Sequence, residues 1–434
     1  MEADSANLLP LLEKQWGAAR LDHLRQIGRI AQQLGTPAYL VGGAVRDLFL
    51  KRYAPDLDVA VEGDTRMLAE ACKAQIHGAH YQFHAQFGTA ILEDSQGVAL
   101  DLAQCRLEHY PAPAALPEVH PGNIHADLAR RDFTVNAMAI RLDPQHFGIL
   151  LDPYDGQADL QAGLLRTLHS RSFLDDPTRI LRGLRFATRF QMDLAPECHQ
   201  QLKQALQADI FTQLSGARLW RELRYLLELE ALPVALSLLT AWKLWFLLRP
   251  TPPASNTMPT LLQRGQEQIQ WLSAQFPEEP LAIFIPMLTL IWQDVTLRDI
   301  QHYLDRWPVP DRSQLLADLR VLPGLPDTLL KAKRPSQKAN IWQGVSVAGI
   351  LAAMAIYADN PTLVDSARLY LQVQRRLPSP FNGQELQTLG LKAGPSLGKT
   401  LKLLREAQLD GEISNKENAQ QWLIKQGILP PNPL

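Results

Sequence analysis

The hydrophobic pattern divides the chain into two parts of different texture. In the first part, apolar residues recur at helical spacing over residues 21–34, and the run ends at Gly35 and Pro37, which predicts a helix that stops there. Short apolar or alternating runs follow and predict strands at 38–41, 56–61, 81–83, 89–92, 98–103 and 137–142, with a helix opening near Ala44. Strands mixed with helices over 38–150 indicate a compact domain built from both kinds of element.

The second part, from about residue 160, keeps a helical periodicity almost to the end of the chain. Leu, Ala, Gln and Arg dominate it, and proline clusters interrupt it at 250–259, 277–286, 308–310 and 378–380. A small number of consecutive helical subdomains is the simplest interpretation of this pattern.

Composition excludes several classes of protein. With 46% hydrophobic and 20% charged residues, the 434-residue chain is not intrinsically disordered. Its formal net charge of −2 creates no global field toward nucleic acid or membranes, so RNA binding would require local basic clusters.

The cysteines and the apolar runs bear on the compartment. Cys72, Cys105 and Cys198 stand far apart without a CxxC pair, which argues against a disulfide framework or structural zinc and fits a reducing compartment. The N-terminus has no apolar signal segment, and the most apolar run, 281–292, is too short to span a bilayer. We therefore expect a soluble, cytoplasmic protein without a membrane partner.

Four motifs carry candidate chemistry, and the first is a Gly42-Gly43 turn between a predicted strand and a predicted helix. Glycines let the backbone approach a phosphate, and the helix N-terminus offers free N–H groups. Arg46, one turn into the helix, adds a bidentate phosphate donor. A tight turn without any ligand is the alternative interpretation.

The second motif is Asp56-x-Asp58, where a strand period of two places both carboxylates on one face. Two such close charges repel each other, and a divalent cation such as Mg²⁺ relieves the repulsion. In isolation the pair would suit a solvated strand edge, but after a glycine turn and Arg46 it describes a metal-dependent nucleotidyl-transfer site. Asp101, on a further predicted strand, is either a third carboxylate of this site or a surface residue.

The third motif places Arg130 and Arg131 directly before Asp132. Two arginines and an aspartate on one turn suit contacts with a triphosphate and with ribose hydroxyls. A salt-bridged surface turn would have the same residues.

The fourth motif follows Pro177, which after two aspartates is a good helix start. Asp176 and Arg179 are three residues apart, and Arg182 and Arg185 continue the same spacing. Either this is a solvated basic face, or the Asp–Arg pair presents one acceptor and several donors to a base edge while the later arginines reach phosphates.

In this order, the motifs resemble those of class II tRNA nucleotidyltransferases and bacterial poly(A) polymerases, a family of polymerase-β-like nucleotidyltransferases. The resemblance rests on LVGGAVRD with DLDVAV, RRDFTVNAMA, the neck-like segment 151–168, DDPTRILRGLRFATRF at 175–190, and more loosely the tail-like segment 382–414. It implies an α+β fold. A catalytic head with a small mixed sheet (1–150) would be followed by an all-α neck (151–250), body (251–375) and tRNA-binding tail (376–434).

The resemblance also implies a role for each motif residue. Two carboxylates would be catalytic and hold Mg²⁺: Asp56 and Asp58. Four residues would contact the triphosphate or, for the last, the ribose: Gly43, Arg46, Arg131 and Asp132. Four residues would act from the predicted helix, the first two on the base and the others on the triphosphate side: Asp176, Arg179, Arg182 and Arg185.

The Asp176–Arg179 pair makes a chemical prediction of its own. Cytosine and adenine each present an exocyclic amine donor beside a ring-nitrogen acceptor, and uracil and guanine present the reverse order. One Asp acceptor beside one Arg donor therefore accepts C and A and leaves polar groups unpaired with U or G. The family's selecting motif usually opens with Glu, where this chain has the shorter Asp175, and this departure bears on how Arg179 is braced and on the switch from C to A.

Together these features predict a CCA-adding tRNA nucleotidyltransferase that uses CTP, ATP and Mg²⁺, with tRNA as acceptor and no obligate protein partner. The alternatives are an enzyme that adds only A, a poly(A) polymerase and, from another class, an inactive RNA-binding protein, against which the intact Asp56-x-Asp58 argues. CC-only addition is disfavoured because 106–129 fills the place of a flexible loop that such enzymes lack.

The RNA is expected along the helical body and tail. Two basic clusters there suit phosphate contacts, or are ordinary solvated helix faces: Lys331, Lys333, Arg334 and Lys338, and Lys392, Lys399, Lys402 and Arg405.

Overall fold

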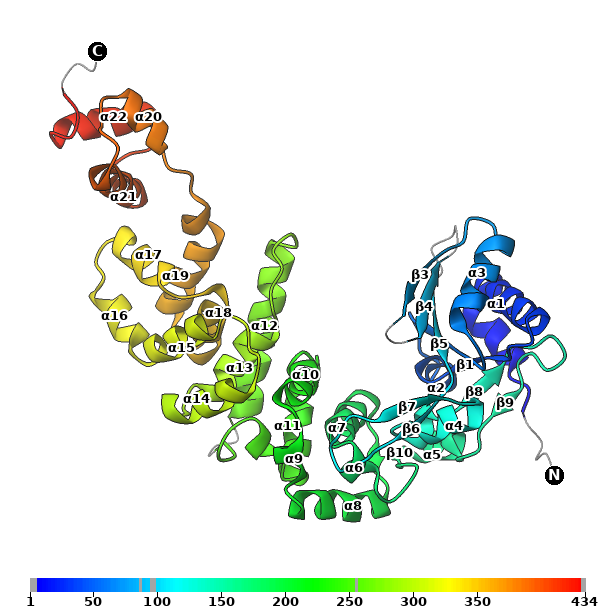
Figure 1. Cartoon of the computed structure of the whole chain (residues 1–434). Helices are drawn as coiled ribbons and strands as arrows, with labels where there is room; N and C mark the ends of the chain where they lie inside the picture. The colour runs from blue at the N-terminus through cyan, green and yellow to red at the C-terminus, as the bar shows by residue number, and fades with distance from the viewer. Residues whose placement is uncertain (1–5, 86–87, 94–98, 254–256, 431–434) are drawn as a thin grey trace. The chain divides into compact units, whose positions relative to one another are not determined.

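The computed structural model describes residues 6–85, 88–93, 99–253 and 257–430 (Figure 1). Contacts within the chain divide it into two compact units, Met1–Glu222 and Leu223–Leu434. The finer division into head, neck, body and tail stays a prediction.

The first unit is built on a seven-stranded sheet, in the order β3 (His80–His84), β4 (Thr89–Glu93), β5 (Ala99–Gln104), β2 (Leu57–Val61), β1 (Ala38–Val41), β8 (Ala139–Arg141) and β9 (Leu150–Leu151). β2 and β5 pair in parallel, whereas the other neighbours pair antiparallel. The expected α+β fold with a mixed sheet is thus confirmed. Each predicted strand coincides with an observed one, although residue 98 lies outside the described residues.

Helices cover both faces of this sheet (Figure 1). α1 (Leu9–Gln33) and α3 (Thr65–Gln75) pack on one face, and α4 (Ile124–Ala129) packs on the other against Tyr39 and Val41 of β1. All four residues of β1 are buried because both of its faces are covered. The helix predicted over 21–34 is the second half of α1, which begins earlier and breaks at Gly17, where φ is 66° and ψ is 162°.

The segment 106–129, expected to fill the place of a flexible loop, is mostly ordered. β6 (Arg106–His109) and β7 (Glu118–Pro121) form an antiparallel hairpin, and α4 follows it. The hairpin escaped the sequence analysis because β7 is exposed along its whole length and therefore has no apolar alternation.

The remaining elements of the first unit connect the sheet to a helical segment. They are α2 (Gly43–Phe49), η1 (Thr134–Asn136), α5 (Gly156–Ala162), β10 (Leu164–Leu165), α6 (Ser172–Asp175), α7 (Thr178–Phe190), β11 (Asp193–Leu194), α8 (Pro196–Gln207), α9 (Ile210–Gln213) and α10 (Gly216–Leu227). β10 and β11, which precede α6 and follow α7 in the chain, pair in parallel. α10 runs across the boundary between the two units.

Helices are the only regular elements among the described residues of the second unit, as the periodicity predicts. After α10 it comprises α11 (Leu232–Ala241), η2 (Trp245–Leu247), α12 (Met258–Gln275), α13 (Phe284–Trp292), α14 (Leu297–Arg306), α15 (Arg312–Val321), η3 (Leu322–Gly324), α16 (Leu325–Lys331), α17 (Pro335–Gln343), α18 (Val347–Ile356), α19 (Pro361–Gln372), η4 (Gln374–Arg376), α20 (Gly383–Thr388), α21 (Pro395–Leu409) and α22 (Lys416–Lys425). A separate hydrophobic cluster, from Phe381 to Leu429, lies wholly within the predicted tail.

Over the described residues, no single helix has both the length and the apolar character needed to cross a membrane. α17 and α18 meet those criteria only as a pair, with a bend of 112° between them.

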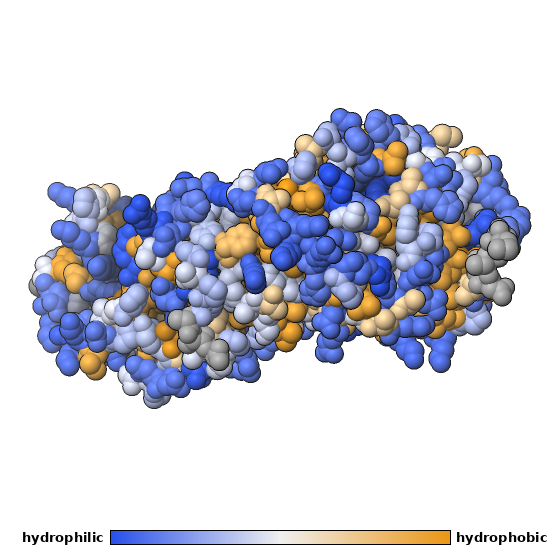
Figure 2. All heavy atoms as spheres, turned by 90° about the horizontal axis from the view of Figure 1, so that it is seen from below, coloured by the Kyte–Doolittle hydropathy of each residue, from blue (hydrophilic) through white to orange (hydrophobic). Residues whose placement is uncertain are grey.

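The face drawn in Figure 2 is mostly hydrophilic, with hydrophobic residues scattered in small groups. Single exposed apolar residues are normal for a folded protein.

Candidate active site

A cavity of about 550 Å³ opens in the first unit between the Gly42-Gly43 turn, the turn after α4 and the start of α7. Most of the predicted site residues line it: Gly43, Arg46, Asp58, Arg131, Asp132, Asp176, Arg179 and Arg182. The cavity therefore gathers residues that are more than a hundred positions apart in the sequence.

The glycine turn closes one wall of the cavity. Gly42 has a φ of 67°, a left-handed conformation that favours glycine. A Cβ atom there would lie 2.7 Å from Arg131 Nη1 and 3.9 Å from Asp58 Oδ2. Gly42, the first residue of the predicted glycine turn, thus lets the backbone approach both charged side chains.

Arg46 is built into the wall of the cavity. Its side chain is buried, with Nε 2.9 Å from Asp47 Oδ1 and Nη1 2.7 Å from Asn136 Oδ1. The guanidinium also lies 4.4 Å from the centre of the Phe190 ring. Burial lowers the pKa of Arg46, and the neighbouring Asp47 opposes that shift. Arg46 therefore supplies positive potential and fixes Asn136 as well as facing the cavity.

Carboxylates gather on the neighbouring strands β2 and β5. Asp58 and Asp101 are register partners in this parallel pair, and Asp56 is close enough for its charge to act on both. Partial desolvation raises the pKa of both carboxyls, although both residues keep solvent contact; the charges of Asp101 and Asp56 raise the pKa of Asp58 further, and the charge of Asp56 raises that of Asp101. At Asp58, the Arg131 guanidinium opposes this rise in pKa.

These carboxylates fit a divalent cation by their chemistry. They are oxygen donors that repel one another, which is the donor set that Mg²⁺ takes. Within the described residues, no three acidic, His or Cys side chains are close enough to hold a metal unaided. A cation here would take further oxygens from substrate phosphates, as is usual for Mg²⁺. Asp56 does not line the cavity itself.

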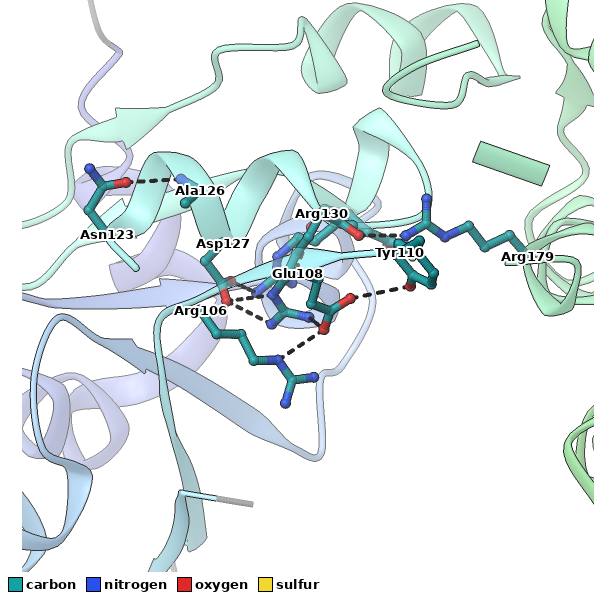
Figure 3. A network of polar contacts seen from close by, with 10 residues as sticks. Arg106, Glu108, Tyr110, Asn123, Ala126, Asp127, Arg130 and Arg179 are labelled. Atoms are coloured by element: carbon teal, nitrogen blue, oxygen red, sulfur yellow. Dashed lines mark hydrogen bonds and ion pairs between the residues drawn. The ribbon is translucent and has the colours of Figure 1, made fainter. Parts of the chain in front are cut away.

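The two arginines of the third motif are held by buried acids (Figure 3). Asp127 of α4 accepts from Arg130 Nη2 at 2.6 Å and from Arg131 Nη2 at 2.8 Å, and Glu108 of β6 accepts from Arg130 Nη1 at 3.0 Å. Burial favours a raised pKa for Asp127, but the two arginines outweigh it and lower the pKa. Asp127 is a site residue that the sequence analysis missed.

Asp132 is buried, and both of its carboxylate oxygens accept hydrogen bonds from protein groups. Its Oδ1 accepts from Asn136 Nδ2 at 2.9 Å, and its Oδ2 accepts from Arg182 Nε at 2.8 Å. Burial favours a raised pKa, but the charge of Arg182 and the hydrogen bonds from Asn136 and Arg182 lower it to about 2. The hydrogen bond between Arg182 and Asp132 therefore links α7 to the turn after α4.

α7 begins as predicted, with Pro177 as its N-cap, and packs closely on the third motif. Gly183 makes this approach possible because a Cβ there would lie 2.8 Å from Cζ of the buried Phe133. Asp176, just before this helix, and Arg179 and Arg182 on it therefore line the cavity.

Arg179 is not braced by Asp175. Its Nη1 donates to Ser172 Oγ at 2.6 Å, its Nη2 donates to the Arg130 carbonyl at 2.7 Å, and Tyr110 lies under the guanidinium. Asp175 pairs instead with Arg171, 3.3 Å away. Neutral acceptors thus hold the Arg179 guanidinium, although Asp175 lines a neighbouring pocket together with Arg179 and is only 14% exposed.

Arg185 is one predicted site residue that the structure places elsewhere. Its Nη1 donates to Glu222 Oε2 at 2.6 Å, and Arg185 is not among the residues that line the cavity. Two arginines of α10, Arg218 and Arg221, line the cavity and were missed. The arginines of 218–224 recur every three residues, as those of α7 do. This repeat is the sequence feature from which they could have been predicted.

The predicted basic clusters lie in the second unit. Lys331, Lys333 and Arg334 are exposed, as a phosphate contact requires. Arg405 instead donates to the carbonyls of Leu377 at 3.2 Å and Gln374 at 2.8 Å, which makes it a structural residue of the fold.

Comparisons with known proteins point to one family. The sequence family described as the Poly A polymerase head domain matches residues 38–166. The A-adding tRNA nucleotidyltransferase of Halalkalibacterium halodurans is 31% identical over 96% of this chain and 95% of its own length. The CC-adding enzyme of Deinococcus radiodurans is 30% identical over 97% of this chain and 98% of its own length. The A-adding enzyme of Geobacter sulfurreducens is 29% identical, and this chain covers only 46% of it, about half.

Solved structures agree with this assignment. An apo CCA-adding enzyme superposes with a TM-score of 0.81 at 30% identity, covering 97% of this chain and 99% of the other. A CCA-adding enzyme with CTP gives a TM-score of 0.78 at 27% identity, covering 97% of this chain and 98% of the other. With relatives of this identity along nearly its whole length, the chain belongs to the class II tRNA nucleotidyltransferase family.

Proposed function

We propose that this protein adds the CCA sequence to the 3′ end of tRNA, from CTP and ATP and without a nucleic-acid template. The observation that carries the proposal is that one cavity brings Asp176 and Arg179, which suit the base edges of C and A, to Asp58 and the glycine turn. A base-reading pair and a carboxylate site at one cavity are what protein-directed nucleotidyl transfer requires.

Several residues of the cavity are suited to bind the triphosphate. Arg131 and Arg182 supply donors for the triphosphate, and the Gly42-Gly43 turn leaves room for it. Arg131 Nε is buried and has no hydrogen-bond partner in the described structure, so it is a donor that a substrate oxygen would satisfy.

Asp56 and Asp58 are the residues that would hold Mg²⁺, with further oxygens taken from the substrate phosphates. The chemistry that this cation supplies is positive charge at the attacking hydroxyl and at the leaving pyrophosphate. Asp58 would orient the 3′-hydroxyl of the RNA toward the α-phosphate, because it lines the cavity whereas Asp56 does not.

Addition of A alone is the second candidate. Arg179 is fixed by Ser172 and the Arg130 carbonyl and not by an adjustable carboxylate. A purine carries its base-pairing edge farther from the ribose than a pyrimidine does, so a rigid Asp–Arg pair suits one of the two. The A-adding relative at 31% identity is consistent with this candidate.

Incorporation on three tRNA transcripts tests these functions. The transcripts end before CCA, after C and after CC, and each nucleotide is supplied with Mg²⁺ singly and together. Completion of CCA on the first transcript would support the full enzyme, and addition of A only to the third would support the second candidate.

The other outcomes contradict the proposal in distinct ways. C addition that stops before A would indicate a CC-adding enzyme, like the Deinococcus relative. Long A tails on unrelated RNA would indicate a poly(A) polymerase, and no incorporation with intact tRNA binding would indicate an inactive RNA-binding protein. Asp58→Ala is the matched control and should abolish incorporation while leaving tRNA affinity within a few-fold.

A further inference from the structure

Arg218 is a charged residue of the cavity that belongs to none of the four sequence motifs. It lies on α10 and its side chain is only 17% exposed. Its guanidinium has two anchors on different segments. Nη2 lies 2.9 Å from Asp176 Oδ1, and Nη1 lies 2.8 Å from the carbonyl oxygen of Ala114, beyond the end of β6.

The contact with Asp176 determines which carboxylate oxygen remains available. Asp176 Oδ1 also accepts from the backbone N–H of Thr178 at 3.0 Å and from its hydroxyl at 2.6 Å. In the described part of the chain, all the recorded contacts of this carboxylate are thus made by Oδ1. Oδ2 is the oxygen left for a substrate amine.

The second contact, with the Ala114 carbonyl, restricts the movement of the Arg218 side chain. Ala114 is buried, has a φ of 56°, and donates its N–H to the Leu174 carbonyl of α6 at 3.1 Å. The carbonyl that receives Arg218 is therefore itself held against the segment that precedes Asp176. A planar guanidinium that is bound at both ends has little freedom to rotate, so it restrains the carboxylate to which it donates.

We propose that Arg218 is a positioning residue for base selection, which holds Asp176 so that Oδ2 accepts the exocyclic amine of the incoming C or A. This inference rests on the proposed function. Without Arg218, Thr178 alone would hold Oδ1, and the carboxylate would be free to pivot about that point. The cost would fall on the recognition of the amine and not on the transfer chemistry at Asp58.

The test compares two nucleotides that differ only in that amine. Wild-type enzyme and Arg218→Gln are given a CC-ended tRNA with ATP or with purine riboside triphosphate, which lacks the 6-amine. If the wild type adds only C, a tRNA lacking CCA is used with CTP and its analogue without the 4-amine. We expect the wild type to prefer the amine-bearing nucleotide by roughly 10- to 100-fold in kcat/KM, as for a hydrogen bond to a charged group. In Arg218→Gln this preference should fall about tenfold, mainly through KM for the natural nucleotide.

Further variants separate positioning from stability. Arg218→Lys, whose single ammonium cannot serve both anchors as a fork does, should give an intermediate preference. It also provides the measurement if Arg218→Gln does not fold. Asp176→Ala should lose the preference, and adding Arg218→Gln to it should cause no further loss. Arg224→Gln is the control on the same helix, because Arg224 pairs with Glu228 one turn on, and it should match the wild type.

The outcomes distinguish failure of this inference from failure of the proposed function on which it rests. A folded Arg218→Gln or Arg218→Lys that keeps the wild-type preference, even with a lower melting temperature, would overturn the role of Arg218 alone. A wild-type enzyme that incorporates no nucleotide on any tRNA would overturn the proposed function, and the inference with it.

Discussion

Arg179 donates a 2.6 Å hydrogen bond to Ser172 Oγ, whereas Asp175, which opens the motif, forms its ion pair with Arg171. Ser172 is fully buried, so this contact lies inside the protein and not at its surface. A hydroxyl and a backbone carbonyl thus orient the guanidinium that we propose reads the base. The departure at Asp175 therefore has a structural counterpart at Ser172.

Ser172→Ala should weaken nucleotide use. Removing the hydroxyl leaves Arg179 Nη1 without an acceptor, which costs about 1–3 kcal/mol for a charged donor and corresponds to roughly a 5- to 100-fold loss in kcat/KM for the preferred nucleotide. Steady-state kinetics on tRNA substrates would measure it. Asp175→Ala is the matched variant and should stay within about twofold, because its partner is Arg171. A larger loss in Asp175→Ala than in Ser172→Ala would show that Asp175 braces Arg179 after all.

With ATP or CTP present throughout, Mg²⁺ should raise the melting temperature of the wild-type protein. A cation that binds only the folded protein stabilises it by mass action, and its expected ligands are Asp56, Asp58 and the phosphates of the nucleotide. In Asp58→Asn this increase should be lost or strongly reduced, and incorporation should be abolished. Without Mg²⁺, Asp58→Asn should be at least as stable as the wild type, because it removes a charge that repels its register partner Asp101. An equal increase in both proteins would place the cation elsewhere.

Arg182→Met should destabilise the first unit most strongly near neutral pH. Asp132 has a pKa of about 2 in the folded protein, against about 3.9 for an unperturbed Asp. Its stabilising contribution is therefore present above about pH 4 and is lost as the pH falls toward 2. Without Arg182, burial raises the pKa of Asp132, and we expect a loss of about 1–3 kcal/mol at pH 7, reduced because Arg182 is itself partly exposed.

Urea unfolding at pH 7 and at pH 4 checks this dependence. The difference between wild type and Arg182→Met should shrink at the lower pH, where a carboxyl with a raised pKa takes up a proton. Adding Asp132→Asn to Arg182→Met should recover part of the lost stability. A difference that does not vary with pH would mean that Arg182 acts through packing and not through the Asp132 charge.

Gly183→Ala should destabilise the protein although alanine is the better helix former. The new Cβ would lie 2.8 Å from the ring of Phe133, which is fully buried and packed edge-on against Phe173 and Phe186. Overpacking of this kind costs about 1–3 kcal/mol, more than the gain of about 1 kcal/mol in helix propensity.

Gly398→Ala provides the matched control for this substitution. Gly398 lies inside α21 with no heavy atom within 4 Å of its Cβ position, so alanine there should stabilise by about 0.5–1 kcal/mol. Thermal unfolding of the two variants would give shifts of opposite sign. A stabilising Gly183→Ala would mean that α7 and Phe133 are less tightly packed than the structure shows.

The local pattern of the sequence was sufficient for most elements of the catalytic unit. The strand at 38–41, the glycine turn and the helix start at Pro177 were predicted because short apolar runs, glycines and prolines act on their immediate neighbours. The hairpin of β6 and β7 was not predicted, because exposed polar strands leave no periodic signal.

The partners of the site residues depended on tertiary structure. Asp101 lies beside Asp58 because β2 and β5 pair in parallel, and Arg218 reaches Asp176 across 42 residues of sequence. Arg185 turned to Glu222 although its spacing matched that of Arg182, which turned to Asp132. The sequence by itself determined which residue types the site contains and which elements carry them. Only the tertiary structure decided which charge meets which, because a long arginine side chain selects its partner from whatever acids the fold brings within a few ångströms, and sequence spacing does not record that choice.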